Sequence, residues 1–236
     1  MLDTTFWLDN QDARDYGIRL QKPVEIGSTS RVVETVQVQG RNGDLVFDTG
    51  AYSNRTGTAL CFALAENVIN QVSAANSFLL DGAGYRRLEV HEDDEHYYLA
   101  RITNGASVSS RLKLLNPFEI TFDIMPQAFL KNGAMPIIYT QTGTMHNIYG
   151  GEARPLLKVN GNGNGAININ GVVIGITDIN EYIMIDCETA YAYKGTHNLN
   201  NSVNAAQMPT LKKGDNEIAF SGNITSIEVT PRWWDV

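Results

Sequence analysis

The chain has 236 residues, of which 43% are hydrophobic and 19% charged, and its formal net charge is -8. Its 18 Lys and Arg residues are scattered among 26 Asp and Glu residues, which excludes the clustered basic face that specific nucleic-acid binding requires. The length suits two domains of ordinary size, and the 21 glycines indicate the many turns of a mainly β protein.

The chain opens with two short predicted strands, at residues 4–8 and 16–20. No basic leader precedes them, and no apolar window approaches eighteen residues, so we expect neither a secretion signal nor a membrane span. We therefore expect synthesis in the cytoplasm. Two cysteines, Cys61 and Cys187, lie inside apolar runs, which predicts buried thiols rather than a disulfide framework.

A β-hairpin is predicted over residues 31–56. Four valines between residues 32 and 38 lead in, residues 40–43 (Gly-Arg-Asn-Gly) form the turn, and residues 45–47 lead out. Asn42-Gly43 is the dipeptide best able to reach positive φ at both centres of a tight turn. A polar exit, residues 52–56, follows.

These residues carry a resemblance to a known family. Arg31 at the strand start, the Gly-Arg-Asn-Gly turn and the exit Tyr52-x-Asn54-Arg55 resemble the N-terminal domain of distal tail (Dit) proteins of long-tailed bacteriophages. The resemblance implies that this segment helps to close six copies into a ring at the end of the tail tube. From it we predict Arg31, Arg41, Tyr52 and Arg55 as ring-interface residues.

Beyond the hairpin, residues 58–65 fit either a strand or a helix, and residues 66–80 have the apolar spacing of an amphipathic helix. Residues 85–91 and 96–102 read as two strands joined by an acidic turn. Strict alternation over residues 118–124 predicts a half-buried strand, which we expect Pro126 to end.

From residue 133 onward no helical periodicity is present, and short predicted strands alternate with Asn-Gly segments, as in a β-sandwich. We predict a loop at residues 160–165 (Asn-Gly-Asn-Gly-Asn-Gly) and a turn at Asn170-Gly171. The loop lacks the Lys and Ser/Thr of a phosphate cradle and the acidic residues of a calcium site.

The second half continues the resemblance. Arg154-Pro155, the segment 185–188, the loop 211–216 and the basic-aromatic end 226–234 resemble the galectin-like sandwich of distal tail proteins, especially of phages that infect Gram-positive hosts. The predicted fold class is therefore mainly β: an N-terminal β-rich ring domain with one α-helix at residues 1–132, then a galectin-like β-sandwich at residues 133–236.

The resemblance implies a structural virion protein rather than an enzyme, with no cofactor or metal. It implies a homohexameric ring, single or back to back, which serves as a baseplate hub at the siphovirus tail tip. The implied partners are the tail tube protein, a tail-associated or tail-spike protein and receptor-binding or baseplate proteins, with no specific nucleic acid and no membrane.

Three other interpretations remain open from the residues. Leu45 to Ala51 (LVFDTGA) matches the signature around the catalytic aspartate of aspartic proteases, so Asp48 would act in a symmetric dimer, although a turn role for Asp48 is favoured. His91 and His96 bracket four acids but specify no third metal ligand. A sugar-binding module would depend on Trp233 or Trp234, yet the arginine and the Trp-Gly-x-Glu segment of galectins are missing.

Overall fold

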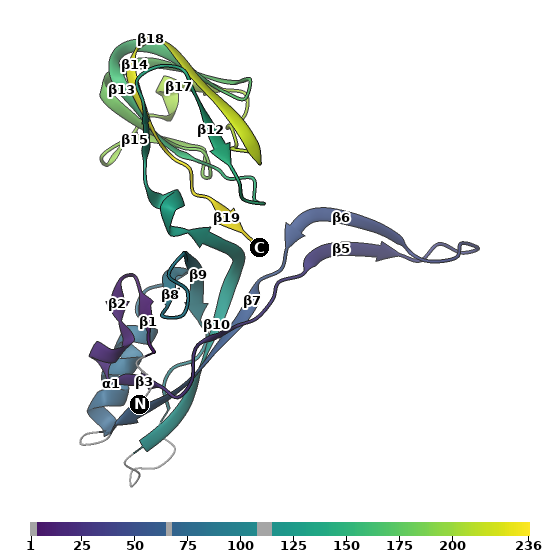
Figure 1. Cartoon of the computed structure of the whole chain (residues 1–236), viewed down its shortest axis with the longest axis vertical. Helices are drawn as coiled ribbons and strands as arrows, with labels where there is room; N and C mark the ends of the chain where they lie inside the picture. The colour runs from purple at the N-terminus through teal and green to yellow at the C-terminus, as the bar shows by residue number, and fades with distance from the viewer. Residues whose placement is uncertain (1–3, 65–67, 108–114) are drawn as a thin grey trace. The chain divides into compact units, whose positions relative to one another are not determined.

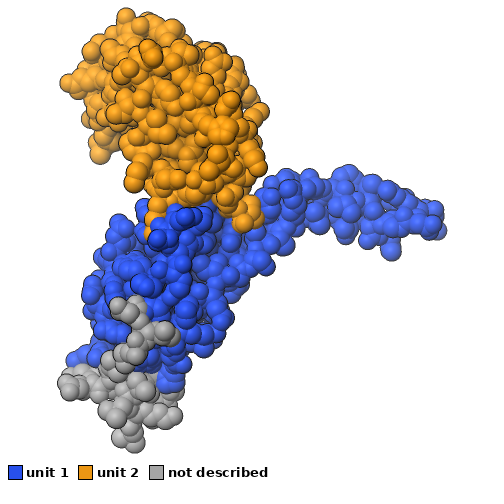
Figure 2. All heavy atoms as spheres, viewed as in Figure 1, with its two compact units in different colours: residues 1–128 blue, residues 129–236 orange. Residues whose placement is uncertain are grey.

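The computed structural model describes residues 4–64, 68–107 and 115–236, and it is mainly β with one α-helix among those residues. The chain divides into two compact units, residues 1–128 and residues 129–236, which are coloured separately in Figure 2. Each unit has its own hydrophobic core. The predicted mainly β fold class is confirmed, including the single helix within the described residues.

The first unit is built on one antiparallel sheet with strand order β2-β1-β8-β9-β10-β7-β3, and β4 also pairs with β7 (Figure 1). A separate two-stranded sheet, β5 with β6, leaves this sheet where β6 leads into β7. The elements, in chain order, are β1 (Phe6–Leu8), β2 (Gln11–Asp12), the 3₁₀ helix η1 (Ala13–Tyr16), β3 (Ile18–Leu20), β4 (Glu25–Ile26), β5 (Arg31–Val36), β6 (Leu45–Tyr52), β7 (Arg55–Leu64), α1 (Val68–Leu79), β8 (Arg86–Val90), β9 (His96–Ile102) and β10 (Leu115–Leu130).

The helix covers the start of the chain. Ala75, Phe78 and Leu79 are buried on one side of α1, and Phe78 stacks on Tyr16 with ring centroids 4.3 Å apart. Phe6 connects the helix to the sheet. Its ring lies edge-on to that of Phe122, with the ring centroids 5.5 Å apart. Aromatic pairs of this kind stabilise a core beyond the area they bury. The predicted helix is confirmed over Val68–Leu79, and residues 66–67 of the prediction lie outside the described residues.

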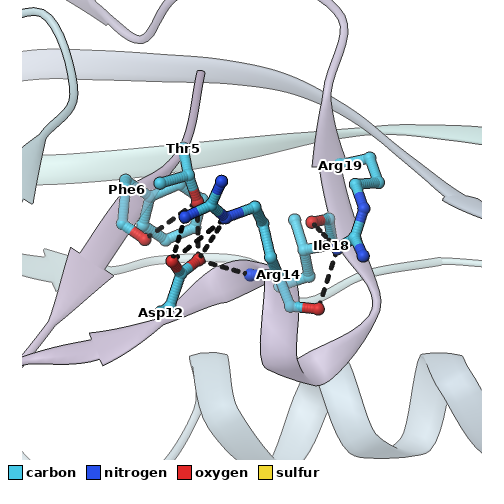
Figure 3. Close-up of polar contacts among 6 residues, drawn as sticks. All are labelled: Thr5, Phe6, Asp12, Arg14, Ile18 and Arg19. Carbon is cyan, nitrogen blue, oxygen red and sulfur yellow. Dashed lines mark hydrogen bonds and ion pairs between the residues drawn. The ribbon is translucent and has the colours of Figure 1, made fainter. Parts of the chain in front are cut away.

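The turn through β2 and η1 is fixed by one carboxylate, as Figure 3 shows. Asp12 caps η1 by accepting from the backbone N–H of Arg14 at 2.8 Å, and it also accepts from Thr5 Oγ1 at 2.8 Å. The Arg14 guanidinium pairs with the same carboxylate at 2.7 Å. Burial raises the pKa of Asp12, but these hydrogen bonds from Arg14 and Thr5 outweigh it and hold the pKa below its ordinary value.

Strand β10 carries the predicted alternation, with Phe118, Ile120, Phe122 and Ile124 all buried. The expectation that Pro126 ends this strand is wrong, because β10 continues to Leu130. Its pairing with β7 ends at Ile124, opposite Arg55, so proline interrupts no bond of that ladder. The undecided segment 58–65 is part of strand β7 as far as Leu64, and residue 65 lies outside the described residues.

The second unit is one antiparallel network with strand order β11-β18-β13-β14-β15-β16, in which β12 also pairs with β18 and β17 with β14 (Figure 1). Its elements are η2 (Lys131–Ala134), β11 (Ile137–Tyr139), β12 (Gly143–Asn147), β13 (Leu156–Ile169), β14 (Val172–Asp186), β15 (Tyr191–Lys194), β16 (His197–Asn198), η3 (Asn200–Ser202), β17 (Val203–Ala205), β18 (Gly214–Thr230) and β19 (Trp234–Asp235).

Three long strands, β13, β14 and β18, fold over near their middles and so supply both layers of a sandwich. One half of β18 pairs with β11 and the other half with β12, while β14 divides in the same way between β15 and β17. Leu157 from one half of β13 and Ile167 from the other are both fully buried in the same core. Register shifts at the middle of β13 mark the fold-over, as bulges do at sheet corners.

The prediction of a loop at residues 160–165 is therefore wrong, because the Asn-Gly run is the bent middle of β13. Its glycines allow close approach of β18: a Cβ on Gly161 would lie 2.3 Å from the backbone oxygen of Asn223, and one on Gly165 2.6 Å from the Ile224 side chain. The predicted turn at Asn170-Gly171 is confirmed, with φ of 53° and 85°, and it joins β13 to β14.

Candidate assembly surface

The hairpin β5–β6, with its connecting loop at residues 37–44, is called the arm below. Every residue of β5 is exposed, and so is nearly all of β6. The arm forms a two-stranded sheet of its own, and in Figure 2 it stands clear of the rest of the first unit. A lone two-stranded ribbon buries too little surface to be stable by itself, so this geometry points to a covering partner.

Both faces of the arm carry apolar side chains. Val46 and Phe47, which are 57% and 51% exposed, are neighbours in β6 and therefore point to opposite faces. Val33 lies on the face of Val46, and Val36 on the face of Phe47, because directly paired residues share a face. A ribbon that is apolar on both sides, with two unpaired edges, is suited to insertion between other strands rather than to packing on one surface.

The tip of the arm is wider than the tight turn predicted at residues 40–43. The strands end at Val36 and resume at Leu45, so the connection spans residues 37–44. Gly40 and Gly43 have positive φ, 83° and 78°, whereas Asn42 does not. The glycines thus provide the reversal at two separate points of a wider loop, and Arg41 lies exposed between them.

The root of the arm is held by polar contacts on both strands. Ser53 N–H donates to the Ser30 carbonyl at 2.9 Å, and Thr29 Oγ1 donates to the Ser53 carbonyl. Asn54 Nδ2 bridges the arm to the sheet, because it donates to Tyr85 Oη at 2.7 Å and to Asp123 at 2.8 Å. These partners lie 31 and 69 positions from Asn54, and no local sequence pattern predicts such a pairing.

Asp123 is the acceptor at the centre of this root. Arg101 Nε donates to it at 2.6 Å, in addition to the bond from Asn54. Burial raises the pKa of Asp123, but the hydrogen bonds from Asn54 and Arg101 outweigh it and keep the pKa below its ordinary value. The carboxylate is therefore ionised at neutral pH, and in this form it accepts both hydrogen bonds.

The four predicted interface residues fall in two environments. Arg31 and Tyr52 face each other across the arm, with the guanidinium 5.1 Å from the ring centroid, and Arg41 is exposed in the loop. Arg55 is different, because it is buried at the start of β7, where it donates to the Pro126 carbonyl and lies over the Tyr98 ring at 5.9 Å. Burial lowers the pKa of Arg55. Arg55 thus secures the arm root from inside the first unit.

Asp48 lies in strand β6, on the exposed arm. It pairs with Arg31 at 2.8 Å and accepts from the backbone N–H of Gly50, which has φ of 75°. Asp48 thus accepts a backbone hydrogen bond beside a glycine of positive φ, but it lies within a strand rather than at the favoured turn. An aspartate of this kind is held as an ion pair on an open ribbon, which is not the water-excluding dyad of a protease.

The remaining candidate residues have local structural partners. His96 Nδ1 lies 2.9 Å from Asp93, which also accepts from Tyr98 Oη at 2.9 Å, and His91 stacks on Trp7. No group of three His, Cys, Asp or Glu residues suited to a metal ion occurs in the described part of the chain.

The two terminal tryptophans pack against their own unit. Trp233 is only 6% exposed, and its carbonyl accepts from the Leu130 N–H at 2.9 Å. Trp234 packs on Gly151, where a Cβ would lie 2.4 Å from the indole. They therefore close the end of the second unit rather than offer an open platform to a sugar.

Comparison with known proteins gives a structural match over nearly the whole chain. No protein-family model matches the sequence, and no curated protein matches it either. The chain superposes on the crystal structure of SPP1 Dit (gp 19.1), described as a paradigm of hub adsorption apparatus in Gram-positive infecting phages, with a TM-score of 0.71 and 11% sequence identity. The match covers 97% of this chain and 98% of that one.

The chain has the fold of a phage distal tail protein. The resemblance seen in the sequence is thereby confirmed at the level of the fold, over both units. Among the residues described, no helix is both long and apolar enough to cross a membrane.

Proposed function

We propose that this chain is a structural protein of a phage tail tip, in which six copies close into a ring through the arm. The N-terminal domain predicted from the sequence, residues 1–132, would form the ring, and the galectin-like sandwich at residues 133–236 would present further surface to other virion proteins. The observation that carries the proposal is the arm: an anchored ribbon, apolar on both faces, in a chain with the fold of a Dit hub protein.

Ring closure accounts for the arm physically. Head-to-tail contacts between identical copies close when the rotation between neighbours divides the circle, and they otherwise extend into filaments. Insertion of each arm between strands of the next copy would cover its apolar faces and pair its unpaired edges. Arg31, Arg41 and Tyr52 lie on the arm and belong to the proposed interface, whereas Arg55 supports the root.

The proposed partners follow from this role. The ring would join the tail tube protein on one face and a tail-associated or tail-spike protein on the other, with receptor-binding or baseplate proteins around it. A net charge of -8 suits a passage for DNA, because an acidic wall does not retain a polyanion. Back-to-back pairing of two rings is part of the same proposal.

Multi-angle light scattering of the purified full-length chain tests the ring. The expected mass is that of six 26.0-kDa chains, or of twelve for paired rings. A clean dimer would favour the protease arrangement, and a monomer at every concentration would contradict self-assembly through the arm. Asp48→Asn is a second test, in a peptidase assay. The protease arrangement expects this variant to lose activity, whereas the ring proposal expects it to match the wild type.

A further inference from the structure

A small hollow lies in the second unit beside the bend of β14. Its volume is about 200 Å³, and it is partly enclosed. Five residues of β14 form one side: Asp178, Ile179, Asn180, Tyr182 and Ile183. Four residues of the stretch from the end of β15 to the end of η3 form the other: Lys194, His197, Leu199 and Ser202. The volume is below the range of about 300–1,000 Å³ typical of drug-sized ligands, so it suits a group the size of a single ring.

The backbone of this wall is held in an unfavourable conformation. Asp178 and Glu181 are not glycines, yet their φ values are 54° and 64°. Non-glycine residues in this left-handed region are uncommon and persist where the surroundings enforce them, often at binding sites. The Asn-Gly run supplies the enforcement, because Asn164 Oδ1 accepts from Asp178 N–H and Asn162 Oδ1 accepts from Glu181 N–H, each at 3.1 Å.

The floor of the hollow is apolar and its rim is polar. Ile179 and Ile183 are buried beneath it, and Leu199 and Tyr182 are half-buried at its sides. The rim presents a carboxylate, an amide, an imidazole and a hydroxyl, from Asp178, Asn180, His197 and Ser202. This set contains both donors and acceptors.

The charge of the hollow argues against an anion. Lys194 is already engaged, since its Nζ donates to the Asn180 carbonyl at 2.6 Å and to Glu181 at 2.8 Å, and it lies 5.0 Å from the Tyr182 ring centroid. Asp178 adds a negative charge at the rim. A phosphate or carboxylate would therefore meet a carboxylate without a free cation opposite it.

From these features we infer that the hollow binds one neutral pyranose ring, free or at the end of a glycan. The C–H face of the ring would cover Ile179 and Leu199, and its hydroxyls, which both donate and accept, would engage Asp178, Asn180, His197 and Ser202. This inference does not depend on ring assembly, because every residue involved lies within the second unit.

Saturation-transfer NMR on the full-length protein tests the inference directly. The probes are glucose, galactose, N-acetylglucosamine and their methyl glycosides, which mimic the last unit of a glycan, together with N-acetyltyrosinamide as a protein-like aromatic. We expect transfer to the ring protons of at least one sugar. Transfer only to the methyl glycosides would identify a glycan end as the ligand, and equal transfer to the free sugar would identify the monosaccharide.

Two variants of the hollow should lose this signal. His197→Ala removes one rim group and is expected to weaken binding about fivefold to tenfold, and Ser202→Phe fills the space and should abolish binding. His146→Ala is the matched control, an exposed histidine of the same unit outside the hollow, and should bind as the wild type does. No transfer to any sugar, transfer only to N-acetyltyrosinamide, or transfer unchanged in both hollow variants would overturn the inference.

The role of Asn164 as a positioning residue has its own readout. Asn164→Gly removes the acceptor that holds Asp178 and should weaken sugar binding several-fold while the unit still unfolds cooperatively. Asn168→Gly is the control: it lies in the same strand and caps the turn at Gly171 instead, at 2.9 Å. Wild-type affinity in Asn164→Gly would show that the bend does not shape the hollow.

Discussion

Truncation of Val46 and Phe47 to alanine tests the arm quantitatively. The two side chains are 57% and 51% exposed in the single chain, so about half of each surface remains to be covered. Full burial of a Val or Phe side chain contributes about 1.5–3 kcal/mol, so the uncovered halves are worth about 1 kcal/mol each. The double variant should therefore lose about 2 kcal/mol at each interface, or roughly 30-fold in affinity.

A closed ring amplifies this loss. Release of one subunit breaks two interfaces, so the cost of about 4 kcal/mol corresponds to a roughly thousandfold easier opening of the ring. Sedimentation velocity over a dilution series should show wild-type rings persisting at concentrations where the double variant is dissociated.

Two controls separate assembly from folding. The melting temperature of the dissociated variant should match that of dissociated wild type, because surface truncations change stability by less than about 0.5 kcal/mol. Val173→Ala, which truncates a valine that is 53% exposed in the second unit, should leave the ring intact. A double variant that dissociates no more readily than Val173→Ala would refute the reasoning.

Three further predictions concern stability and reactivity. Burial raises the pKa of Asp186, but the hydrogen bond from Arg232 outweighs it and holds the pKa below the ordinary value of 3.8. The ionised carboxylate therefore stabilises the fold fully above pH 3.8, and this stabilisation is lost as the pH falls through the lower native pKa. In Asp186→Asn the free energy of unfolding should depend less on pH in that acid range. Gly165→Ala should lower the melting temperature, with a cost of about 1–3 kcal/mol, whereas Gly175→Ala, whose Cβ would meet nothing closer than 3.7 Å, should not, as calorimetry can show. Burial raises the pKa of the Cys61 thiol to about 12, so a thiol reagent should modify it only after denaturant is added.

Local patterns predicted the elements whose stability is decided within a few residues. The apolar spacing of α1, the alternation of β10 and the positive φ values at Asn170-Gly171 all follow from the chemistry of neighbouring positions. The length of β10 past Pro126 was missed, because whether proline interrupts the ladder with β7 depends on where β7 begins.

The Asn-Gly run failed as a prediction for a different reason. Asn and Gly have a low preference for strands, and six in a row predict a loop. Contacts distant in the sequence override that preference: β18 approaches so closely that only glycine fits at residues 161 and 165, and the asparagine side chains between them hold the bend of β14. Such partners are visible only in the folded chain.

The arm divides its residues between two tasks. Val33, Val46 and Phe47 offer surface to a neighbour, while Asn54 and Asp123 at the root set the direction in which that surface points. Closure of a ring requires one fixed rotation between copies, and an arm free to swing would lose conformational entropy at each contact. A root anchored before assembly reduces that loss, so weak apolar contacts of about 1 kcal/mol per side chain suffice to hold a closed ring.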